Sequence, residues 1–385
     1  MRIEASAPGK LVLVGEYAVL EGAPALVMAV DRRAHVVLED CGGDECRIDA
    51  PDIGVVGAHW QMDTDGCVRW NDLDGFNAER LRLITTVVEM LCAGNSSAPF
   101  RARLDTRTFF LDDTRQKLGL GSSAALTVAL TAAIAARMGC EVPAAQRLIA
   151  MHRMFQDGRG SGVDVAASLR GGMITYRLHS SAPRISPATW PSSLHWCCVW
   201  SGRPAQTSEL LARMAVWRAR APASYGLLLR DLRLSAEAAI MAIEAGNAPA
   251  LLETIALYAE GLRKLGEASG VDIFSLEHRA IGACAAACGV TYKPCGAGGG
   301  DIGVAISNDP LRLREFRIRV AREGFREIEL NLDTCGLHVD GYGAPANGEQ
   351  DHGRTEQSAA TTLSQPFAHA GVLPAFGGRA RAMGA

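Results

Sequence analysis

One stretch of the sequence combines a glycine-rich loop with a helix that is apolar on nearly every side. Residues 122–138 are rich in alanine, have helical spacing and end before Gly139, a common helix stop. A helix that is apolar all round is normally buried, so the rest of the chain must surround it. Its run of lowest polarity, Ala124–Ala136, is only about 13 residues, whereas a membrane span needs about 20. We therefore expect a central core helix and no membrane span.

The loop in front of this helix, residues 117–123, suits an anionic ligand. Glycines let a backbone approach a phosphate closely, because no Cβ is in the way. The free N–H groups and the positive dipole end of a helix start then attract the anion. Ser122 and Ser123 add hydroxyls that can bind phosphate or Mg²⁺. A serine N-cap on a buried helix would explain the same residues, and the loop alone leaves both interpretations open.

Two other phosphate-binding motifs do not fit this chain. A Walker A loop ends in Gly-Lys-Ser/Thr, and this loop has no lysine at that place. A formal match to the dinucleotide fingerprint begins at Gly119, but the charged segment 112–117 precedes it where the fingerprint needs a buried strand. A second match begins at Gly298, but a strand-like segment follows it instead of a helix.

Three further segments place glycines beside ionisable residues. Residues 158–164 end on Asp164, whose carboxylate would orient an acceptor or accept its proton, although a turn capped by that aspartate has the same appearance. Residues 294–303 contain four glycines in five positions between strand-like segments, which indicates strained backbone or close approach to a ligand rather than a linker. Lys10 begins an apolar strand, which favours a positioned charge over a solvated one.

Composition limits the class of ligand. The net charge is −3 over 385 residues, which gives no broad basic surface for nucleic acid or an anionic membrane but allows a local pocket for a small anion. No apolar stretch follows a basic start, so we expect no signal peptide. The 11 cysteines lack metal-binding spacing and favour reduced thiols. We expect a cytoplasmic protein with small-molecule ligands.

Hydrophobic periodicity predicts a mixture of strands and helices. Strands are expected at residues 10–14, 25–39, 101–111, 173–178, 195–200, 288–294, 302–307 and 325–332. Helices are expected at residues 79–93, 122–138, 142–155, 207–246, 248–268 and 310–323. Residues 180–193, rich in serine and proline, are expected to cross between domains. Residues 341–385 have no periodicity and are expected to form a flexible tail.

Together these segments resemble the GHMP kinase family. APGKLVLVGEYAVLEG is similar to the family's first motif, KLGLGSSAAL to its second and CGAGGGDIGVAI to its third, in the family's order. The resemblance extends over residues 5–335. It implies an α+β fold of two domains, an N-terminal domain at 1–180 with the phosphate loop and a ferredoxin-like C-terminal domain at 195–340. It also implies ATP and Mg²⁺ as cofactors, bound between the domains, and leaves a homodimer open.

The resemblance also implies roles for single residues. Lys10 and Asp164 would be catalytic. The ATP phosphates would lie against Gly119, Leu120, Gly121, Ser122, Ser123 and Ala124, with Ser122 or Ser123 near the metal ion. The acceptor would contact Lys10, Tyr17, Arg159, Ser161, Gly298 and Asp301. Mevalonate kinases of the family bind Mg²⁺ partly through a glutamate eleven residues before the catalytic aspartate, where this chain has Arg153.

Within the family, the phosphomevalonate kinase branch is the most similar. Tyr17 follows Gly-Glu where mevalonate kinases usually carry histidine, Asp301 follows a triple glycine, and residues 200–208 resemble a segment of that branch. The expected reaction moves the γ-phosphoryl group of ATP to phosphomevalonate. This acceptor carries a carboxylate and a phosphate and needs cations. Candidates are Lys10, Arg159, Lys293, Arg203 and His152. The arginines would also be explained as solvated surface residues, and His152 is better explained as a packing histidine.

Two rival interpretations remain. Within the same family, the chain would be a mevalonate kinase or a diphosphomevalonate decarboxylase. In a different class, it would be a non-catalytic ligand sensor on the same fold. Such a sensor should have lost a loop glycine or the lysine and aspartate, whereas Lys10, Ser122, Ser123 and Asp164 are all present.

Overall fold

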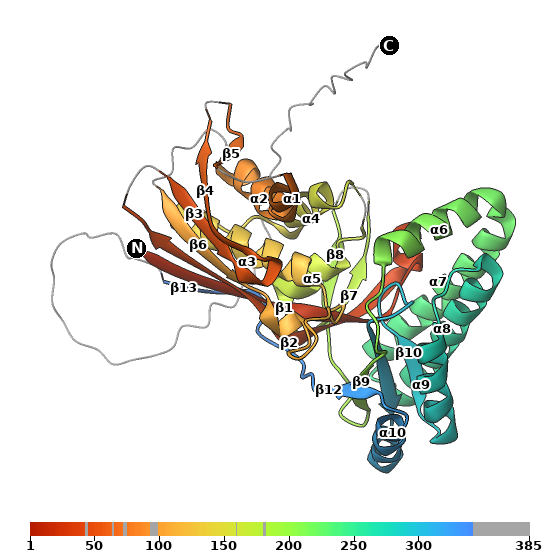
Figure 1. Ribbon diagram of the computed structural model, residues 1–385. Coiled ribbons are helices and arrows are strands. Elements are labelled where there is room, and N and C mark those ends of the chain that lie inside the picture. Colours follow the sequence, from red (N-terminus) through yellow and green to blue (C-terminus); the bar gives the residue numbers. More distant parts are fainter. Residues whose placement is uncertain are drawn as a thin grey trace. The chain divides into compact units, whose positions relative to one another are not determined.

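The structure is a computed structural model, and it describes residues 1–42, 45–63, 65–71, 75–92, 99–158, 160–179 and 182–341. Two sheets with helices packed against them make up this part of the chain (Figure 1). The mixed helix and sheet architecture predicted from the periodicity is therefore confirmed. The predicted tail, residues 341–385, lies outside the described residues except for Gly341.

The first sheet contains nine of the described strands. Its order is β13-β1-β2-β6-β3-β4-β5, and β7 pairs with β2 while β8 pairs with β7. Neighbouring strands are antiparallel except β3 and β6, which are parallel. The strands are β1 (Arg2–Val14), β2 (Pro24–Asp40), β3 (Cys46–Ala50), β4 (Val55–Met62), β5 (Val68–Asn71), β6 (Phe100–Asp105), β7 (Met173–Arg177), β8 (Arg184–Ala188) and β13 (His338–Asp340).

The predicted central helix is α3, Ser122–Arg137. It packs against β1, β2 and the neighbouring helix α5 (Val163–Arg170), with α2 (Arg82–Cys92) and α4 (Ala145–Phe155) on its other sides (Figure 1). Thirteen of its sixteen residues are buried, because its apolar side chains meet protein in every direction. The short helix α1 (Gly75–Arg80) precedes α2, and three 3₁₀ turns lie at η1 (Ala18–Glu21), η2 (Pro51–Ile53) and η3 (Arg107–Phe109).

The second sheet has the order β10-β11-β9-β12, with all neighbours antiparallel. Its strands are β9 (His195–Trp200), β10 (Thr291–Pro294), β11 (Ile302–Ser307) and β12 (Arg326–Ile328). The connection from β9 through helices to β10, then β11, α10 (Pro310–Arg322) and β12, is the ferredoxin-like arrangement that the family resemblance implied. Side chains alternate along β9: Cys197 and Val199 face the cluster under α9 (Leu276–Ala287) and α10, whereas Cys198 joins the main core.

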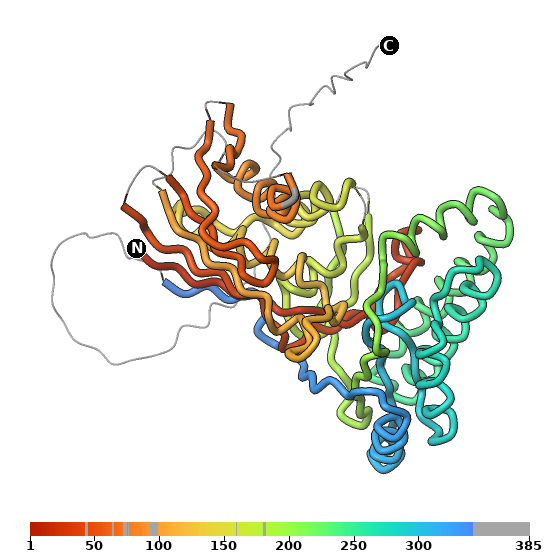
Figure 2. The backbone as a smooth tube through the Cα atoms, in the orientation of Figure 1, coloured from red at the N-terminus to blue at the C-terminus, as the bar shows by residue number. Residues whose placement is uncertain are grey.

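The chain between β1 and β2 packs against helices from the second half of the chain. In Figure 2 this red segment lies among the green and cyan segments of α6 (Thr207–Arg220), α7 (Pro222–Glu244) and α8 (Ala248–Ser269). The hydroxyl of Tyr258 on α8 donates to the carbonyl of Glu16 at 2.6 Å. Both sheets lie in one compact unit, Met1–Gly343, so the predicted domain boundary at 180–195 stays a prediction.

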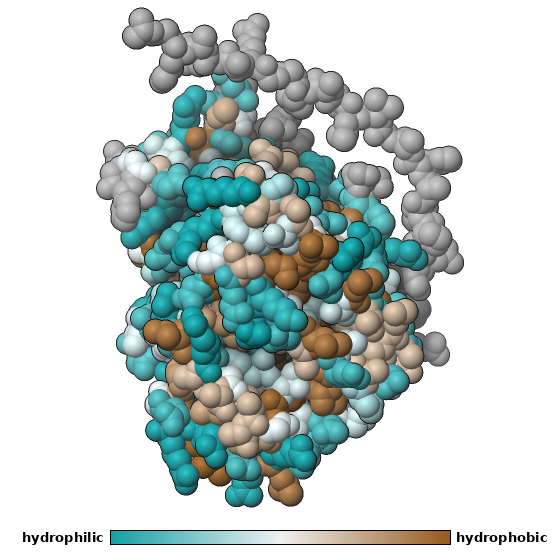
Figure 3. Space-filling model, turned by 90° about the vertical axis from the view of Figure 1, so that its right-hand side faces the viewer, coloured by the Kyte–Doolittle hydropathy of each residue, from teal (hydrophilic) through white to brown (hydrophobic). Residues whose placement is uncertain are grey.

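The outer face of α6–α8 mixes polar and apolar side chains. Figure 3 shows brown and teal residues interspersed on this side. The exposed apolar side chains on these helices are Val216, Leu227, Leu234, Met241 and Leu257. The homodimer stays a prediction. Among the described residues no helix combines the length and apolar character of a membrane span.

Some predicted elements were wrong. Residues 180–193 were expected to cross between domains, and that crossing stays a prediction, but they also contain an unpredicted strand, β8, which pairs with β7 over five residues. The strand expected at 325–332 is the three-residue β12, and the last strand is β13, which returns to the first sheet beside β1. The strands β3–β5 and the helices α5 and α9 were not predicted. Most of them are short, with five residues in β3, four in β5 and eight in α5, so few positions carry their periodicity.

Candidate active site

The glycine loop in front of α3 closes tightly on its neighbours. Gly119 and Gly121 have φ of 76° and 81°, the left-handed region that glycine adopts without strain. A Cβ on Gly119 would lie 2.2 Å from Asp301 Oδ2. Gly121 is the N-cap of α3, so the serine N-cap interpretation is wrong, and no cap side chain takes up the first N–H groups of this helix.

Two backbone contacts fix the start of this loop. Phe110 and Lys117 form an antiparallel bridge, and the Leu118 N–H donates to the Phe109 carbonyl at 2.9 Å. The Lys10 N–H donates to the Leu120 carbonyl, also at 2.9 Å, which ties the loop to β1. The loop is therefore positioned before any ligand arrives.

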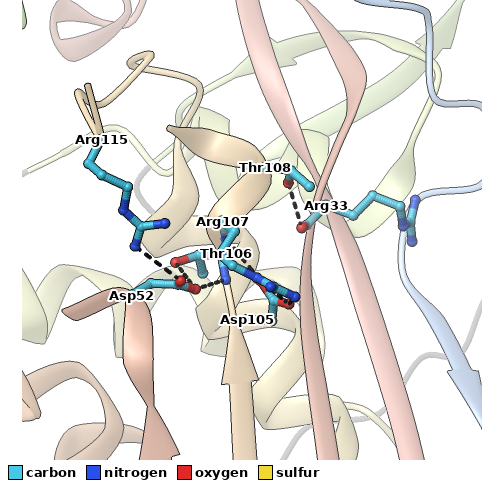
Figure 4. Close-up of polar contacts among 7 residues, drawn as sticks. All are labelled: Arg33, Asp52, Asp105, Thr106, Arg107, Thr108 and Arg115. Carbon is cyan, nitrogen blue, oxygen red and sulfur yellow. Dashed lines mark hydrogen bonds and ion pairs between the residues drawn. The ribbon is translucent and has the colours of Figure 1, made fainter. Parts of the chain in front are cut away.

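Side chains anchor the segment that leads into the loop (Figure 4). Asp52 accepts from the Thr106 N–H at 2.6 Å and from the Arg115 guanidinium at 3.4 Å. The Thr108 hydroxyl donates to the Arg33 carbonyl of β2 at 3.0 Å. A cavity of about 710 Å³ borders this segment, but Arg107 in its wall already pairs with Asp105.

Lys10 and Asp164 meet at Gly121. A Cβ placed on Gly121 would lie 3.3 Å from Lys10 Cγ and 3.7 Å from Asp164 Cβ. The Lys10 ammonium donates to the Gly119 carbonyl at 3.3 Å. Asp164 lies in the first turn of α5 because Gly162, with φ of 82°, turns the chain into that helix. Residues 154 positions apart in sequence are thus brought to the start of α3, as the family resemblance implied.

Lys117 is a cation of this cluster that the sequence reasoning did not single out. It lines the same cleft as Lys10 and lies near the Asp301 carboxylate. Partial burial lowers the pKa of Lys117, and the charge of Lys10 adds to this effect. Burial raises the pKa of Asp301, although the Ala205 N–H, at 2.9 Å, and both lysines favour its carboxylate form. The sequence offered one signal for Lys117 as a site residue: it ends the charged segment 112–117, directly before the glycine loop.

A cleft of about 790 Å³ joins these groups. Its lining includes Lys10, Tyr17, Lys117, Ser123, Ser161, Asp164 and Ala297. A concave site of this size with a few converging polar groups suits a small ligand. Ser123 lines the cleft, whereas Ser122 is 7% exposed and is absent from the lining.

Some of the residues predicted to contact the acceptor line the cleft and others do not. The Tyr17 hydroxyl donates to the Ala297 carbonyl at 2.6 Å, and burial raises the pKa of Tyr17. The Ser161 hydroxyl accepts from the Val163 N–H at 3.3 Å. Gly298 packs against Ile273 rather than lining the cleft, and a Cβ there would lie 2.3 Å from the Ile273 carbonyl oxygen. Arg159 lies outside the described residues.

Lys293, which the sequence offered as a cation for the acceptor, is not available to it. Its ammonium is fully buried and lies 2.5 Å from Glu16 Oε1. It also donates to the Pro294 carbonyl at 2.7 Å. Burial raises the pKa of Glu16, and the charge of Lys293 acts against this rise. The pair therefore has a structural role between β1 and β10.

The family's metal-binding glutamate has no counterpart here. Arg153 donates to the carbonyls of Gly160 and Ser161 at 2.9 and 3.1 Å, so it fixes the loop before Asp164. The described residues contain no group of three or more His, Cys, Asp or Glu side chains that could bind a metal. Ser123 and Asp164 both line the cleft, and two protein oxygens fit Mg²⁺, which takes its other ligands from phosphates and water.

Comparisons with known proteins agree with the family resemblance. The family model described as "GHMP kinases N terminal domain" matches residues 82–172. A phosphomevalonate kinase from a Streptomyces species is 33% identical over 333 residues, 78% of this chain and 88% of that relative. A mevalonate kinase from Thermococcus gammatolerans is 30% identical over 227 residues, 58% of this chain and 64% of that relative.

A solved structure shows the same fold. The phosphomevalonate kinase of Streptococcus pneumoniae, in complex with phosphomevalonate and AMPPNP, matches with a TM-score of 0.69 at 18% identity, covering 86% of this chain and 99% of that one. The motifs, the fold and the relative matched along most of its length agree. This chain is a phosphotransferase that belongs to the GHMP kinase family.

Proposed function

We propose that the protein transfers the γ-phosphoryl group of ATP to phosphomevalonate, giving diphosphomevalonate and ADP. The observation that carries the proposal is the meeting of Lys10 and Asp164 around Gly121 at the start of α3, with Lys117 in the same cleft. Phosphoryl transfer depends mainly on positioning and on stabilising negative charge, and these residues can supply both. The similarity to a phosphomevalonate kinase over 88% of its length supports this acceptor.

The ATP phosphates are proposed to lie against residues 119–124. The unpaired N–H groups and positive end of α3 attract phosphate oxygens there. Mg²⁺, with Ser123 and Asp164 as its protein ligands, would neutralise charge on the β- and γ-phosphates. Lys10 and Lys117 would stabilise the charge shared by the transferred group and the acceptor phosphate.

The acceptor chemistry explains why Asp164 need not be a strong base. A phosphate monoester has a second pKa of about 6, so its oxygen is already largely anionic at neutral pH. Asp164 would then orient the acceptor, Lys10 and the metal, whereas an alcohol acceptor would require removal of a proton. Asp301 is proposed to balance the charges of Lys10 and Lys117 rather than to contact the anionic acceptor directly.

Mevalonate kinase is the second candidate, because curated mevalonate kinases also match this chain. The ligand-sensor interpretation is not supported, since Lys10, Ser123 and Asp164 converge on one cleft. We propose the cytoplasm as the place of the reaction, which agrees with 11 free cysteines.

The decisive assay measures ADP release with mevalonate, phosphomevalonate, diphosphomevalonate, homoserine and galactose, and identifies each product by mass. We expect phosphomevalonate to give the highest kcat/KM. Preference for mevalonate would replace the proposal with the second candidate, and turnover of another acceptor alone would contradict both.

A further inference from the structure

His152 has polar contacts that the three glycine motifs do not explain. It lies near the end of α4 and is 1% exposed, so neither nucleotide nor acceptor reaches it directly. Its Nε2 lies 3.1 Å from Ser123 Oγ, and its Nδ1 lies 4.0 Å from Asp164 Oδ2. The sequence favoured a packing histidine, but the ring contacts Ser123 Oγ, which lines the cleft as a candidate metal ligand.

The charge of Asp164 favours one arrangement of protons. A neutral imidazole donates from one nitrogen and accepts at the other. The Asp164 carboxylate, 4.0 Å from Nδ1, is too distant for a hydrogen bond, but its negative charge favours a proton on Nδ1, so that Nε2 accepts the proton of the Ser123 hydroxyl. This leaves the lone pairs of Ser123 Oγ directed away from the ring, and Ser123 lines the cleft on that side. An oxygen oriented in this way is suited to a hard cation.

The residue next to His152, Arg153, makes the orientation of the Ser123 hydroxyl more important. Arg153 stands where the family's mevalonate kinases carry a glutamate, and it binds the carbonyls of Gly160 and Ser161 instead. The protein ligands are then reduced to Ser123 and Asp164. With few ligands, the groups that orient them contribute more, and losing such an outer contact typically costs 10- to 100-fold in metal affinity or activity.

We propose that His152 is a positioning residue, which orients the Ser123 hydroxyl for the Mg²⁺–nucleotide complex. The inference rests on the proposed kinase function, but it does not depend on which acceptor is used. His152 acts through Ser123 and has no contact with the reacting atoms.

Two substitutions at this position separate orientation from packing. His152→Phe fills a similar volume without a hydrogen bond, and His152→Gln can place an amide nitrogen or oxygen where Nε2 lies. Calorimetry gives the Kd of ADP with and without Mg²⁺, and kinetics give kcat. For His152→Phe we expect Mg²⁺–ADP binding weakened about 10-fold, metal-free ADP binding changed less than about 2-fold, and kcat lowered 10- to 100-fold. His152→Gln should recover most of both losses.

Two controls complete the test. Thr131→Val removes a buried hydroxyl that contacts Met151 Sδ, away from the cleft, and should leave both affinities unchanged. Because His152 acts through Ser123, Ser123→Ala combined with His152→Phe should be no weaker than Ser123→Ala alone. If His152→Phe does not fold, His152→Leu, which also lacks a hydrogen bond, and its combination with Ser123→Ala supply the same comparison.

Unchanged Mg²⁺–ADP affinity in the folded variants would overturn the proposal. Equal losses of ADP affinity with and without Mg²⁺ would also overturn it. So would a double variant in which the losses of Mg²⁺–ADP affinity from the two substitutions add up. If the wild-type protein does not phosphorylate phosphomevalonate, the proposed function fails while the calorimetry still decides the role of His152.

Discussion

In two places of this protein a lysine lies near a carboxylate. In one place the two charges face each other, and in the other they face a cleft. Lys293 and Glu16 are buried and joined at 2.5 Å. Lys10 and Asp164 both border Gly121 and line the cleft, yet in the described part of the chain no ion pair joins them. The charges of Lys293 and Glu16 face each other, whereas charges without an ion pair at a cleft can act on a ligand.

The difference follows from the surrounding residues. Glu16 and Lys293 lie where the β1–β2 connection meets β10, and the Tyr258 hydroxyl closes the same region from α8. Lys10 and Asp164 end at the open start of α3, where glycines keep side chains away. Lys293 and Glu16 therefore concern stability, and Lys10 and Asp164 concern catalysis, which the following substitutions test.

The largest effect is expected for Lys10→Met. Loss of one preorganised charge at a reacting group typically costs 10²- to 10³-fold in kcat, and we expect about a thousandfold because this lysine borders the phosphate loop. Thermal unfolding should change little. Lys264→Met, which removes an exposed lysine on α8, is the matched control and should retain activity. A loss below tenfold for Lys10→Met would contradict its assigned role.

Lys293→Met should act on stability instead. It leaves the Glu16 carboxylate buried without its partner, which typically costs about 3–5 kcal/mol. Urea denaturation measures this cost. Combining it with Glu16→Gln removes the unpaired charge, so the double variant should recover part of the loss. Equal stability of the single and double variants would show that the pair is not coupled.

Stability should depend on pH through His278. This buried histidine donates from Nε2 to the Gly300 carbonyl at 2.8 Å and accepts from Tyr292. Burial lowers the pKa of His278 to about 4 from 6.5, and Lys293 adds to the effect. Between those values the unfolded chain binds a proton that the folded chain does not. The free energy of unfolding should therefore rise by about 3 kcal/mol from pH 4 to 6.5 and level off above.

The variants His278→Gln and His338→Gln provide the comparison for this pH dependence. Removing the buried histidine should flatten the rise between pH 4 and 6.5, while removing the exposed His338 should leave it in place. An equally steep rise in His278→Gln would assign the pH dependence to other groups.

The smallest effect is expected for Asp164→Asn with phosphomevalonate. Because this acceptor needs no strong base, kcat should fall about 10- to 100-fold, through poorer placement of Lys10 and the metal. Any turnover of mevalonate, an alcohol, should suffer more. A loss above about a thousandfold with phosphomevalonate would argue that Asp164 removes a proton, and hence against a phosphate acceptor.

The sequence predicted the cleft residues better than the buried pair. Asp164 ends a glycine-rich segment and Lys10 follows Gly9 at the start of an apolar strand, so the local sequence marks both. The pairing of Lys293 with Glu16 joins residues 277 positions apart, and only the packing of β10 on the β1–β2 connection brings them together. Lys293 therefore looked like a free cation for the acceptor, which was wrong.

The secondary-structure predictions also succeeded where the local pattern was strong and failed where tertiary pairing decided the structure. The helix α3 was predicted to within one residue because its apolar run is long and its glycine boundaries are clear. The strand β8 was missed, since its serine and proline, Ser186 and Pro187, are typical of loops and its pairing with β7 supplies the missing stabilisation. The role of His152 depends on distances from α4 to α3 and α5, which no local pattern shows.

The central claim is that a triphosphate lies at the start of α3 between Lys10, Lys117 and Asp164. A crystal structure with AMPPNP and phosphomevalonate tests it directly. The account predicts the γ-phosphate within hydrogen-bonding distance of the residue 119–123 backbone and the Lys10 ammonium, with the acceptor phosphate facing it. A nucleotide bound in another cavity, or Lys10 and Asp164 turned away from both phosphates, would contradict the account.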